Sequence, residues 1–178
     1  MKYKPRGFVS VIGPSYALVS DPLYVFAREL GRALVDNGFA IYSGGKKGIM
    51  EAVFRGAKES ENYFFGCTIG ILPDSDRENS NRYTDISVAT GIGYARNSIV
   101  ANSGEVVIAI GGGSGTLSEI AFAWQYGKKI IAVDAFEGWA KELSGLKLDK
   151  RRRDKILKAS DIESVIKHLQ KLIPEKKN

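Results

Sequence analysis

The sequence has a single cysteine, Cys67, and a single histidine, His168, among its 178 residues. One cysteine cannot form an internal disulfide, and one residue of each type does not suffice for a His/Cys zinc site. We therefore expect no metal centre. Cys67 lies in an apolar run and is interpreted as a buried structural thiol. His168 is interpreted as a surface or packing residue of a closing helix.

Long apolar runs are also missing. No stretch approaches the roughly 18 to 20 residues that a membrane-spanning helix needs. The first residues lead directly into a strand-like run and do not have the pattern of a signal peptide. Because 44% of the residues are hydrophobic, a substantial core is available. We expect one soluble, cytoplasmic domain over residues 1–178.

The chain has an excess of positive charge, formally +6 at neutral pH. Much of it lies in residues 147–158 and in the tail, 174–178. Such an excess suits nucleic acid, small phosphates or solubility alone. These segments lack the interleaved aromatic residues of a base-stacking surface. We interpret them as a solvated basic face and expect no nucleic-acid partner.

Short apolar runs rich in β-branched residues alternate with helical patterns along the chain. The first run stops at Gly13, and Pro22 and Gly38 mark the start and end of the helix that follows. This alternation predicts an α/β fold, a Rossmann-like doubly wound parallel sheet with helices on both faces. The expected strands are 8–12, 39–42, 65–72, 86–89, 106–110 and 130–133. The expected helices are 22–36, 49–58, 94–102, 116–126 and one that begins at a capping box formed by Ser160 and Glu163. Residues 73–85 form either a flap over a ligand or an ordinary long loop.

Three glycine-rich turns each follow a predicted strand and precede a predicted helix. In a doubly wound sheet such turns converge beyond the carboxyl ends of the strands, where backbone N–H groups and helix dipoles bind anions. Glycine is also needed in tight turns for steric reasons alone, but three turns in register favour a phosphate-bearing ligand. The predicted ligand-binding residues are Gly13, Ser15, Gly44, Gly45, Gly48, Arg96, Asn97, Gly112, Gly113, Ser114, Gly115 and Thr116.

Two familiar nucleotide motifs fit these turns poorly. Residues 43–49 lack the G-x-x-x-x-G-K-[ST] spacing of a phosphate-binding loop of ATPases. Gly111 and Gly113 match the first two glycines of the dinucleotide fingerprint, and Asp134 ends the following strand, as a ribose-binding acid would. However, Thr116 occupies the third glycine position and no second domain remains to hold a hydride acceptor. NAD binding is therefore disfavoured.

Two charged residues, Arg96 and Glu119, lie beside the turns. A cation in the first turn of a helix opposes the helix dipole, so Arg96 indicates an anion nearby. Glu119 has two interpretations, because Thr116-x-x-Glu119 is also the pattern of a capping box. If the protein is an enzyme, Arg96 and Glu119 are its candidate catalytic residues.

The residues from about 8 to 133 resemble the LONELY GUY (LOG) proteins, once labelled lysine-decarboxylase-like, and the related molybdenum cofactor carrier proteins. Residues 111–119, GGGSGTLSE, are similar to the motif P-G-G-x-G-T-x-x-E of the family. Residues 44–50, GGKKGIM, are similar to its motif G-G-x-x-G-L-M. For the enzymes, the resemblance implies hydrolysis of the N-glycosidic bond of a nucleoside 5′-monophosphate, with the phosphate on residues 112–116 and Glu119 near the ribose. It also implies a homodimer or larger homo-oligomer.

The sequence departs from the enzyme pattern at two places. Gly111 replaces the proline, and residues 93–97, GYARN, stand where the enzymes carry M-H-x-R-K. These departures resemble the carrier branch, whose members bind molybdenum cofactor, a phosphorylated pterin, without turning it over. We expect a protein that binds a phosphorylated nucleotide or pterin cofactor, with nucleoside monophosphate phosphoribohydrolase as the alternative. No cofactor is expected to be needed for folding.

Overall fold

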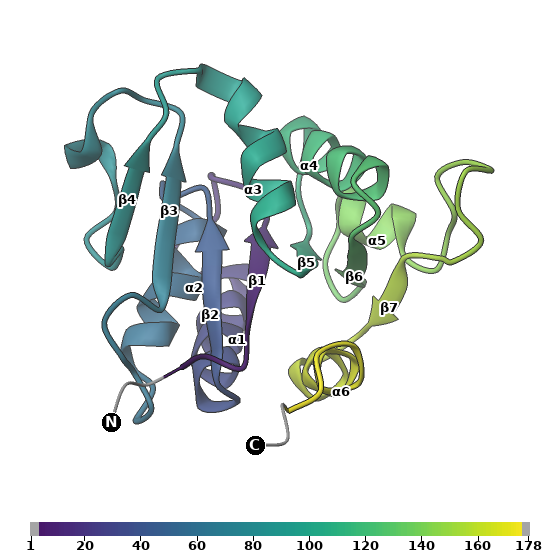
Figure 1. Ribbon diagram of the computed structural model, residues 1–178, viewed down its shortest axis with the longest axis horizontal. Helices are drawn as coiled ribbons and strands as arrows, with labels where there is room; N and C mark the ends of the chain where they lie inside the picture. The colour runs from purple at the N-terminus through teal and green to yellow at the C-terminus, as the bar shows by residue number, and fades with distance from the viewer. Residues whose placement is uncertain (1–3, 176–178) are drawn as a thin grey trace.

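The computed structural model describes residues 4–175, and their strands form one parallel sheet (Figure 1). The order across the sheet is β4-β3-β2-β1-β5-β6-β7, and every neighbouring pair is parallel. This confirms the predicted Rossmann-like doubly wound α/β fold. The strands are β1 (Gly7–Ile12), β2 (Phe39–Ser43), β3 (Thr68–Leu72), β4 (Ile86–Ala89), β5 (Val106–Ile110), β6 (Lys129–Val133) and β7 (Leu157–Ala159).

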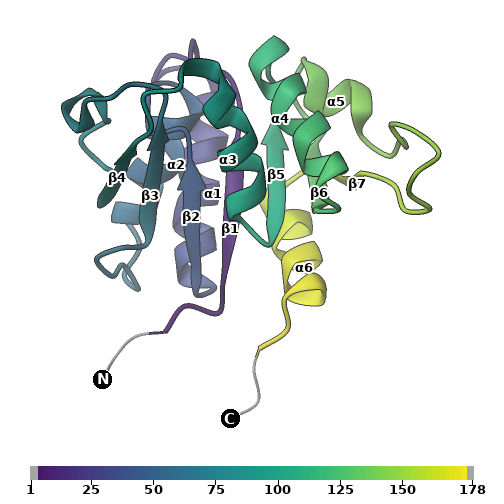
Figure 2. The ribbon, with the colours of Figure 1, turned by 45° about the horizontal axis from the view of Figure 1, so that its top comes forward.

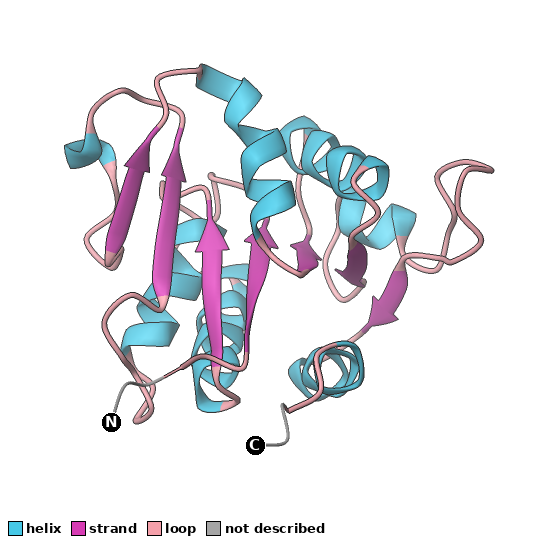
Figure 3. Cartoon of the chain, viewed as in Figure 1, coloured by secondary structure: helices cyan, strands magenta, loops and turns pink. Residues whose placement is uncertain are grey.

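Helices cover both faces of the sheet, and each face has its own hydrophobic core (Figure 3). Side chains alternate between the two faces along a strand. In β5, Val106, Ile108 and Ile110 pack into one core, whereas Val107 and Ala109 pack into the other. The first core is covered by α1 (Pro22–Asp36), α2 (Ile49–Lys58) and α6 (Ile162–Leu172), and the second by α3 (Asn97–Ser103), α4 (Ser114–Gln125) and α5 (Trp139–Leu143).

The strand order reverses direction at β1, which pairs with β2 on one side and β5 on the other. The helices that follow β1 and β5 therefore lie on opposite faces, and the turns at the carboxyl ends of the two strands stay uncovered and adjacent. In a doubly wound sheet this switch point is where ligands bind. The fold thus brings the turn after Ile12 next to the turn after Ile110.

Several element boundaries differ from the sequence prediction. β3 begins at Thr68 rather than at residue 65, because a turn at Gly66, with φ +95°, precedes it. Cys67 lies in this connection and is fully buried, as expected, and burial raises the pKa of its thiol to about 11. The helix predicted over 94–102 is divided into a 3₁₀ turn, η2 (Gly93–Arg96), and α3. α4 begins two residues earlier than predicted.

The predicted capping box of Ser160 and Glu163 is wrong by one residue. Asp161 is the N-cap of α6, and its carboxylate accepts a hydrogen bond from the Ser164 N–H at 2.7 Å. The Ser164 hydroxyl in turn accepts from the Asp161 N–H at 3.2 Å. His168 lies half-buried on this helix, with Nε2 3.0 Å from the Lys158 carbonyl oxygen.

Residues 73–85 form a loop that is tied to the glycine-rich turn after β2. Asn81 donates its backbone N–H to the Gly45 carbonyl at 2.8 Å and its side-chain amide to the Lys46 carbonyl at 2.9 Å. The Lys46 ammonium pairs with the Asp74 carboxylate at 2.8 Å. A short 3₁₀ turn, η1 (Arg77–Asn79), lies within the loop. These contacts favour an ordered loop over a free flap.

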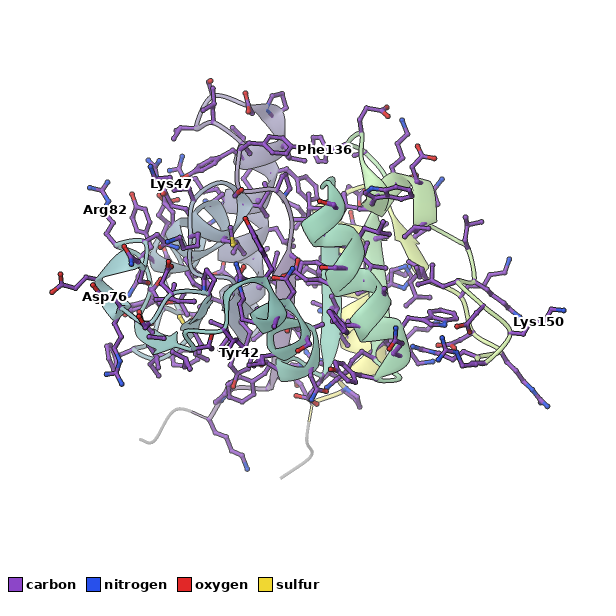
Figure 4. All side chains as sticks on the ribbon, turned by 90° about the horizontal axis from the view of Figure 1, so that it is seen from above. Tyr42, Lys47, Asp76, Arg82, Phe136 and Lys150 are labelled. Atoms are coloured by element: carbon purple, nitrogen blue, oxygen red, sulfur yellow. The ribbon has the colours of Figure 1, made fainter. Side chains whose placement is uncertain are left out.

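Some of the basic residues near the C-terminus are paired with acids. Arg151 pairs with Asp149 at 2.7 Å, and Arg152 pairs with Asp154 at 2.6 Å. The Arg152 guanidinium also donates to the Trp124 carbonyl at 3.0 Å and so connects this segment to the end of α4. Viewed along the strands, Lys150 lies at the opposite end of the molecule from Arg82 in the 73–85 loop (Figure 4).

None of the helices within residues 4–175 is both long enough and apolar enough to cross a membrane.

Helices α1 and α2 pack closely enough that only glycine fits at their crossing. A Cβ on Gly31 would overlap the Val53 carbonyl oxygen, and a Cβ on Gly56 would overlap the Arg28 carbonyl oxygen. We expect Gly31→Ala to lower the free energy of unfolding by about 1–3 kcal/mol, because the helices must separate. Chemical denaturation monitored by circular dichroism measures it.

Gly115→Ala is the matched control for this substitution. Gly115 is also helical, but the nearest atom to an added Cβ is the Asn97 amide nitrogen at 4.0 Å. We expect this variant to be unchanged or more stable by up to about 1 kcal/mol, since alanine favours helix over glycine. Equal losses in both variants would contradict close packing at the α1–α2 crossing.

Candidate functional site

A pocket of about 390 Å³ lies at the carboxyl edge of the sheet, over the switch point between β1 and β5. Figure 4 looks onto this edge, because the carboxyl ends of β1 to β4 point upward in Figure 1. The turn after β1, the start of α4 and the η2–α3 junction form its walls. Its lining residues are Gly13, Pro14, Ser15, Tyr16, Lys46, Met50, Pro73, Tyr94, Arg96, Asn97, Gly113, Ser114, Gly115, Thr116 and Glu119.

The N-terminus of α4 forms one wall. Gly113 is the N-cap, and no side chain caps the helix, so the N–H groups of its first turn have no partner within the helix. Such groups, together with the helix dipole, bind anions. Gly112, with φ +97°, lies directly beneath, and a Cβ there would overlap the Thr116 side chain. The close approach of turn and helix therefore requires glycine at this position.

The capping-box interpretation of Glu119 is wrong. Because the helix begins at Ser114, Thr116 lies inside the first turn and Glu119 lies one turn further on. The Glu119 side chain is buried, with 7% of its surface exposed, and lines the pocket. Burial raises the pKa of Glu119 to about 8, although the positive charge of Arg96 acts in the opposite direction. The carboxyl group is therefore largely protonated at neutral pH.

Arg96 lies opposite Glu119 and is also buried, with 7% exposed. Its Nη1 is 3.9 Å from Glu119 Oε1, too long for a hydrogen bond, and its Nε and Nη1 have no hydrogen-bond partner within residues 4–175. Burial lowers the pKa of the guanidinium, which nevertheless stays charged at any accessible pH. A buried charge with unpaired donors is costly, so the geometry favours an anion or hydroxyl group here.

Glycine at position 44 makes room for this arginine. A Cβ on Gly44 would overlap Arg96 Nη1, and it would lie 2.5 Å from the Met50 sulfur. The Arg96 Nη2 lies 4.0 Å from the same sulfur. The turn after β2 therefore contributes Lys46 to the pocket lining and also makes room for Arg96.

The predicted binding residues fall into two groups. Gly13, Ser15, Arg96, Asn97 and the segment 113–116 are brought together around the pocket. The remaining predicted residues, Gly44, Gly45, Gly48 and Gly112, do not line it. They lie behind the lining and allow turns, strands and helices to approach closely. Asn97 is buried and donates its side-chain amide to the Ser118 hydroxyl at 2.9 Å, which links α3 to α4.

Sequence reasoning missed six lining residues: Pro14, Tyr16, Lys46, Met50, Pro73 and Tyr94. All six are next to, or within, segments that were singled out as turns, loops or helix starts. Tyr94 is 88% exposed and lies at the edge of the pocket. Composition and spacing near the glycines would have indicated these positions, but not which side chains point inward.

Asp134, considered above as a ribose-binding acid, does not line the pocket. It follows β6, and its carboxylate pairs with Lys158 at 2.7 Å. The geometry therefore removes the main support for the dinucleotide interpretation.

Comparison with known proteins identifies several relatives. A cytokinin riboside 5′-monophosphate phosphoribohydrolase of Mycobacterium tuberculosis is 30% identical over 136 residues, covering 70% of this chain and 71% of the relative. The molybdenum cofactor binding protein of Rippkaea orientalis has a similar structure, with a TM-score of 0.79, 34% identity, and coverage of 97% of this chain and 99% of that one.

A third relative, the molybdenum cofactor carrier protein of Chlamydomonas reinhardtii, has a TM-score of 0.78 and 30% identity over 97% of this chain and all of its own. The family model described as the SLOG cluster4 family matches residues 6–166. The chain therefore belongs to the SLOG cluster4 family of LOG-like proteins.

Proposed function

We propose that this chain, acting as a single cytoplasmic domain, binds a phosphate-bearing nucleotide or pterin cofactor as a molybdenum-cofactor-carrier-like protein. The observation that carries the proposal is the buried Arg96 guanidinium, whose Nε and Nη1 are unpaired beside the uncapped N-terminus of α4. Positive charge and free N–H groups that converge on one pocket suit a phosphate or another oxyanion. The carrier proteins named above support the choice of ligand.

The residues present fit a phosphorylated pterin. Gly113, Ser114, Gly115 and Thr116 would hold the phosphate through backbone N–H groups and hydroxyls, and Arg96 would pair with an anionic group. The pocket volume of about 390 Å³ is within the range of small-molecule sites. In the molybdenum cofactor the pterin carries the metal. The role of this chain would be to bind and shield it.

The second candidate function is hydrolysis of a nucleoside 5′-monophosphate to the free base and ribose 5-phosphate. It is favoured by the Mycobacterium tuberculosis relative and by the pKa of Glu119, which lies near neutral pH. A carboxyl group with such a pKa can donate a proton at neutral pH and, once ionised, can stabilise an oxocarbenium-like transition state. Arg96 would fix the substrate beside it.

We also propose that the chain forms a homodimer or larger homo-oligomer through an uncharged face. Between residues 86 and 127 the charged residues are Arg96, Glu105 and Glu119, and the first and last are buried in the pocket. Helices α3 and α4 lie side by side on one face of the sheet (Figure 2). Ile99 on α3 and Tyr126, the C-cap of α4, are exposed and line a shallow groove. Interfaces between identical subunits are poor in charge and rich in such residues.

The binding site is tested by substituting Arg96 and Thr116. We expect Arg96→Ala and Thr116→Val each to weaken binding of AMP, a phosphorylated pterin and inorganic phosphate by about tenfold or more, because each removes a donor to a charged group. Isothermal titration calorimetry measures the affinities. Arg32→Ala, which removes an exposed arginine on α1, is the control for the change in charge. Wild-type affinity in both pocket variants would show that the pocket is wrongly placed.

Hydrolysis is tested by incubating the protein with AMP and measuring adenine and ribose 5-phosphate. The carrier proposal expects no turnover. If turnover occurs, the hydrolase replaces it, and Glu119→Gln should abolish the activity while Glu163→Gln, an exposed substitution on α6, leaves it intact.

The pH dependence of any turnover gives a second readout. A proton-donating Glu119 is protonated below its pKa of about 8, so the rate should fall as the pH rises through that value. A rate that rises across this range would instead assign Glu119 the role of a carboxylate.

The oligomer proposal is tested by light scattering coupled to size-exclusion chromatography. We expect a mass of at least two chains for the wild type and a smaller one for Ile99→Asp and Tyr126→Asp, because a charge in the interface is costly to bury. Val25→Asp, on the opposite face of the sheet, is the control. A monomeric wild type would overturn the proposal.

A further inference from the structure

Three glycines lie behind the walls of the pocket in a similar arrangement. Gly48 and Gly112 were predicted to bind the ligand but do not line the pocket, and Gly138 was not considered in the sequence analysis. Gly138 is the N-cap of α5, and its φ of 125° and ψ of −176° are accessible essentially to glycine alone. A Cβ on Gly138 would lie 2.6 Å from the Gly112 nitrogen and 2.7 Å from both the Gly111 carbonyl carbon and the Gly112 oxygen. The start of α5 therefore packs directly on the backbone of the glycine-rich turn after β5.

The first two N–H groups of α5 bind the carbonyl groups of that turn. Trp139 donates its backbone N–H to the Gly112 carbonyl, and Ala140 donates to the Gly111 carbonyl, both at 3.0 Å. No peptide bond within residues 4–175 is cis. In a planar trans peptide the C=O and the N–H of the same unit point in opposite directions. The N–H groups of Gly112 and Gly113 therefore point away from α5.

Pointing away from α5 means pointing towards the pocket. β5 lies between β6, which leads into α5, and β1, whose following turn lines the pocket. The turn after β5 thus has α5 on one side and the ligand site on the other. The carbonyl groups of the turn are held by α5. The N–H groups of Gly112 and Gly113 therefore face the opposite side of the turn, where Gly113 lines the pocket.

The same arrangement occurs on the other side of the pocket. Gly48 is the N-cap of α2, with φ +66°, and a Cβ there would overlap the Pro14 carbonyl oxygen. The first N–H of α2, that of Ile49, donates to this carbonyl at 3.0 Å. The N–H of Ser15, in the same peptide unit, therefore points away from α2, and Ser15 lines the pocket.

We propose that Gly138 and Gly48 are positioning residues, which let the N-termini of α5 and α2 hold the carbonyls of the two neighbouring turns so that the opposite N–H groups face an oxyanion. Neither glycine contacts the ligand site itself. The proposal rests on the proposed binding of a phosphate group and adds the means by which its donors are oriented before the ligand arrives. Such preorganisation strengthens binding because no reorientation accompanies it.

Two pairs of variants test the proposal with inorganic phosphate and AMP as probes. Gly138→Ala should weaken both affinities by about tenfold or more, because at least one donor to the charged group is misaligned. Gly145→Ala is the control: Gly145 follows the other end of α5, also has a positive φ, of +76°, and has open space around an added Cβ. It should bind like the wild type.

The second pair separates the hydrogen bond from packing and from misfolding. Trp139→Pro and Trp139→Ala both lose the indole ring, but only the proline variant loses the N–H that binds the Gly112 carbonyl. Proline is well tolerated at the first position of a helix. We expect phosphate affinity to fall by about tenfold in Trp139→Pro relative to Trp139→Ala. The carbonyl ¹³C chemical shift of Gly112, measured without ligand, should change in the proline variant alone.

The outcomes distinguish this inference from the proposed function. If the wild type binds neither phosphate nor AMP, the proposed function fails, and the Gly112 carbonyl shift still decides whether α5 holds the turn. If the wild type binds them but Gly138→Ala and Trp139→Pro bind as well as their controls, the positioning role is overturned and the pocket stands.

Discussion

Arg96 carries a guanidinium that is charged at every accessible pH, and the fold buries it with Nε and Nη1 unpaired. Glu119 offsets little of the resulting cost, because it lies 3.9 Å away and its own burial favours the protonated form at neutral pH. The surrounding backbone is arranged to tolerate this arginine, since Gly44 leaves the space that its Nη1 occupies. A buried cation of this kind is stabilised by a nearby anion, and the uncapped N-terminus of α4 lies beside it.

The fold was predictable from the sequence because its core strands are short apolar runs punctuated by glycine. β1, β2, β5 and β6 were located to within one residue at either end. β7 and α5 were missed for a physical reason: each is three to five residues long, and β7 contains the exposed Lys158, so neither has a periodic pattern. The capping box of α6 shows a further limit. Ser160 and Asp161 are both good caps, so the sequence alone does not decide between them.

The lining of the candidate pocket was predicted in part, and the errors have a common cause. The glycines mark where the chain must turn tightly. They do not indicate whether the space left by the missing side chain faces a ligand or another segment of the chain. Gly113 and Gly115 face the pocket, whereas Gly44 makes room for Arg96 and Gly112 for Thr116. The Thr116-x-x-Glu119 pattern was ambiguous for the same reason. Its meaning depends on where α4 begins, which is fixed by the glycine turn and not by the pattern.

The balance between binding and hydrolysis depends on what surrounds Arg96. In the LOG enzyme pattern that the chain resembles, a lysine follows the arginine, and here Asn97 takes its place. Asn97 is buried and donates its side-chain amide to the Ser118 hydroxyl, so it connects α3 to α4 and adds no charge to the pocket.

Lys46, the other cation at the pocket, is already paired with Asp74. Among the cations that line the pocket, Arg96 is thus the one whose Nε and Nη1 lack a hydrogen-bond partner within residues 4–175. A site that binds the substrate and the transition state equally tightly has affinity but does not accelerate the reaction. Acceleration requires groups whose contacts become stronger as charge develops in the transition state. A pocket whose one available cation is fixed in place is suited to holding an oxyanion in its ground state, which is the requirement of a carrier.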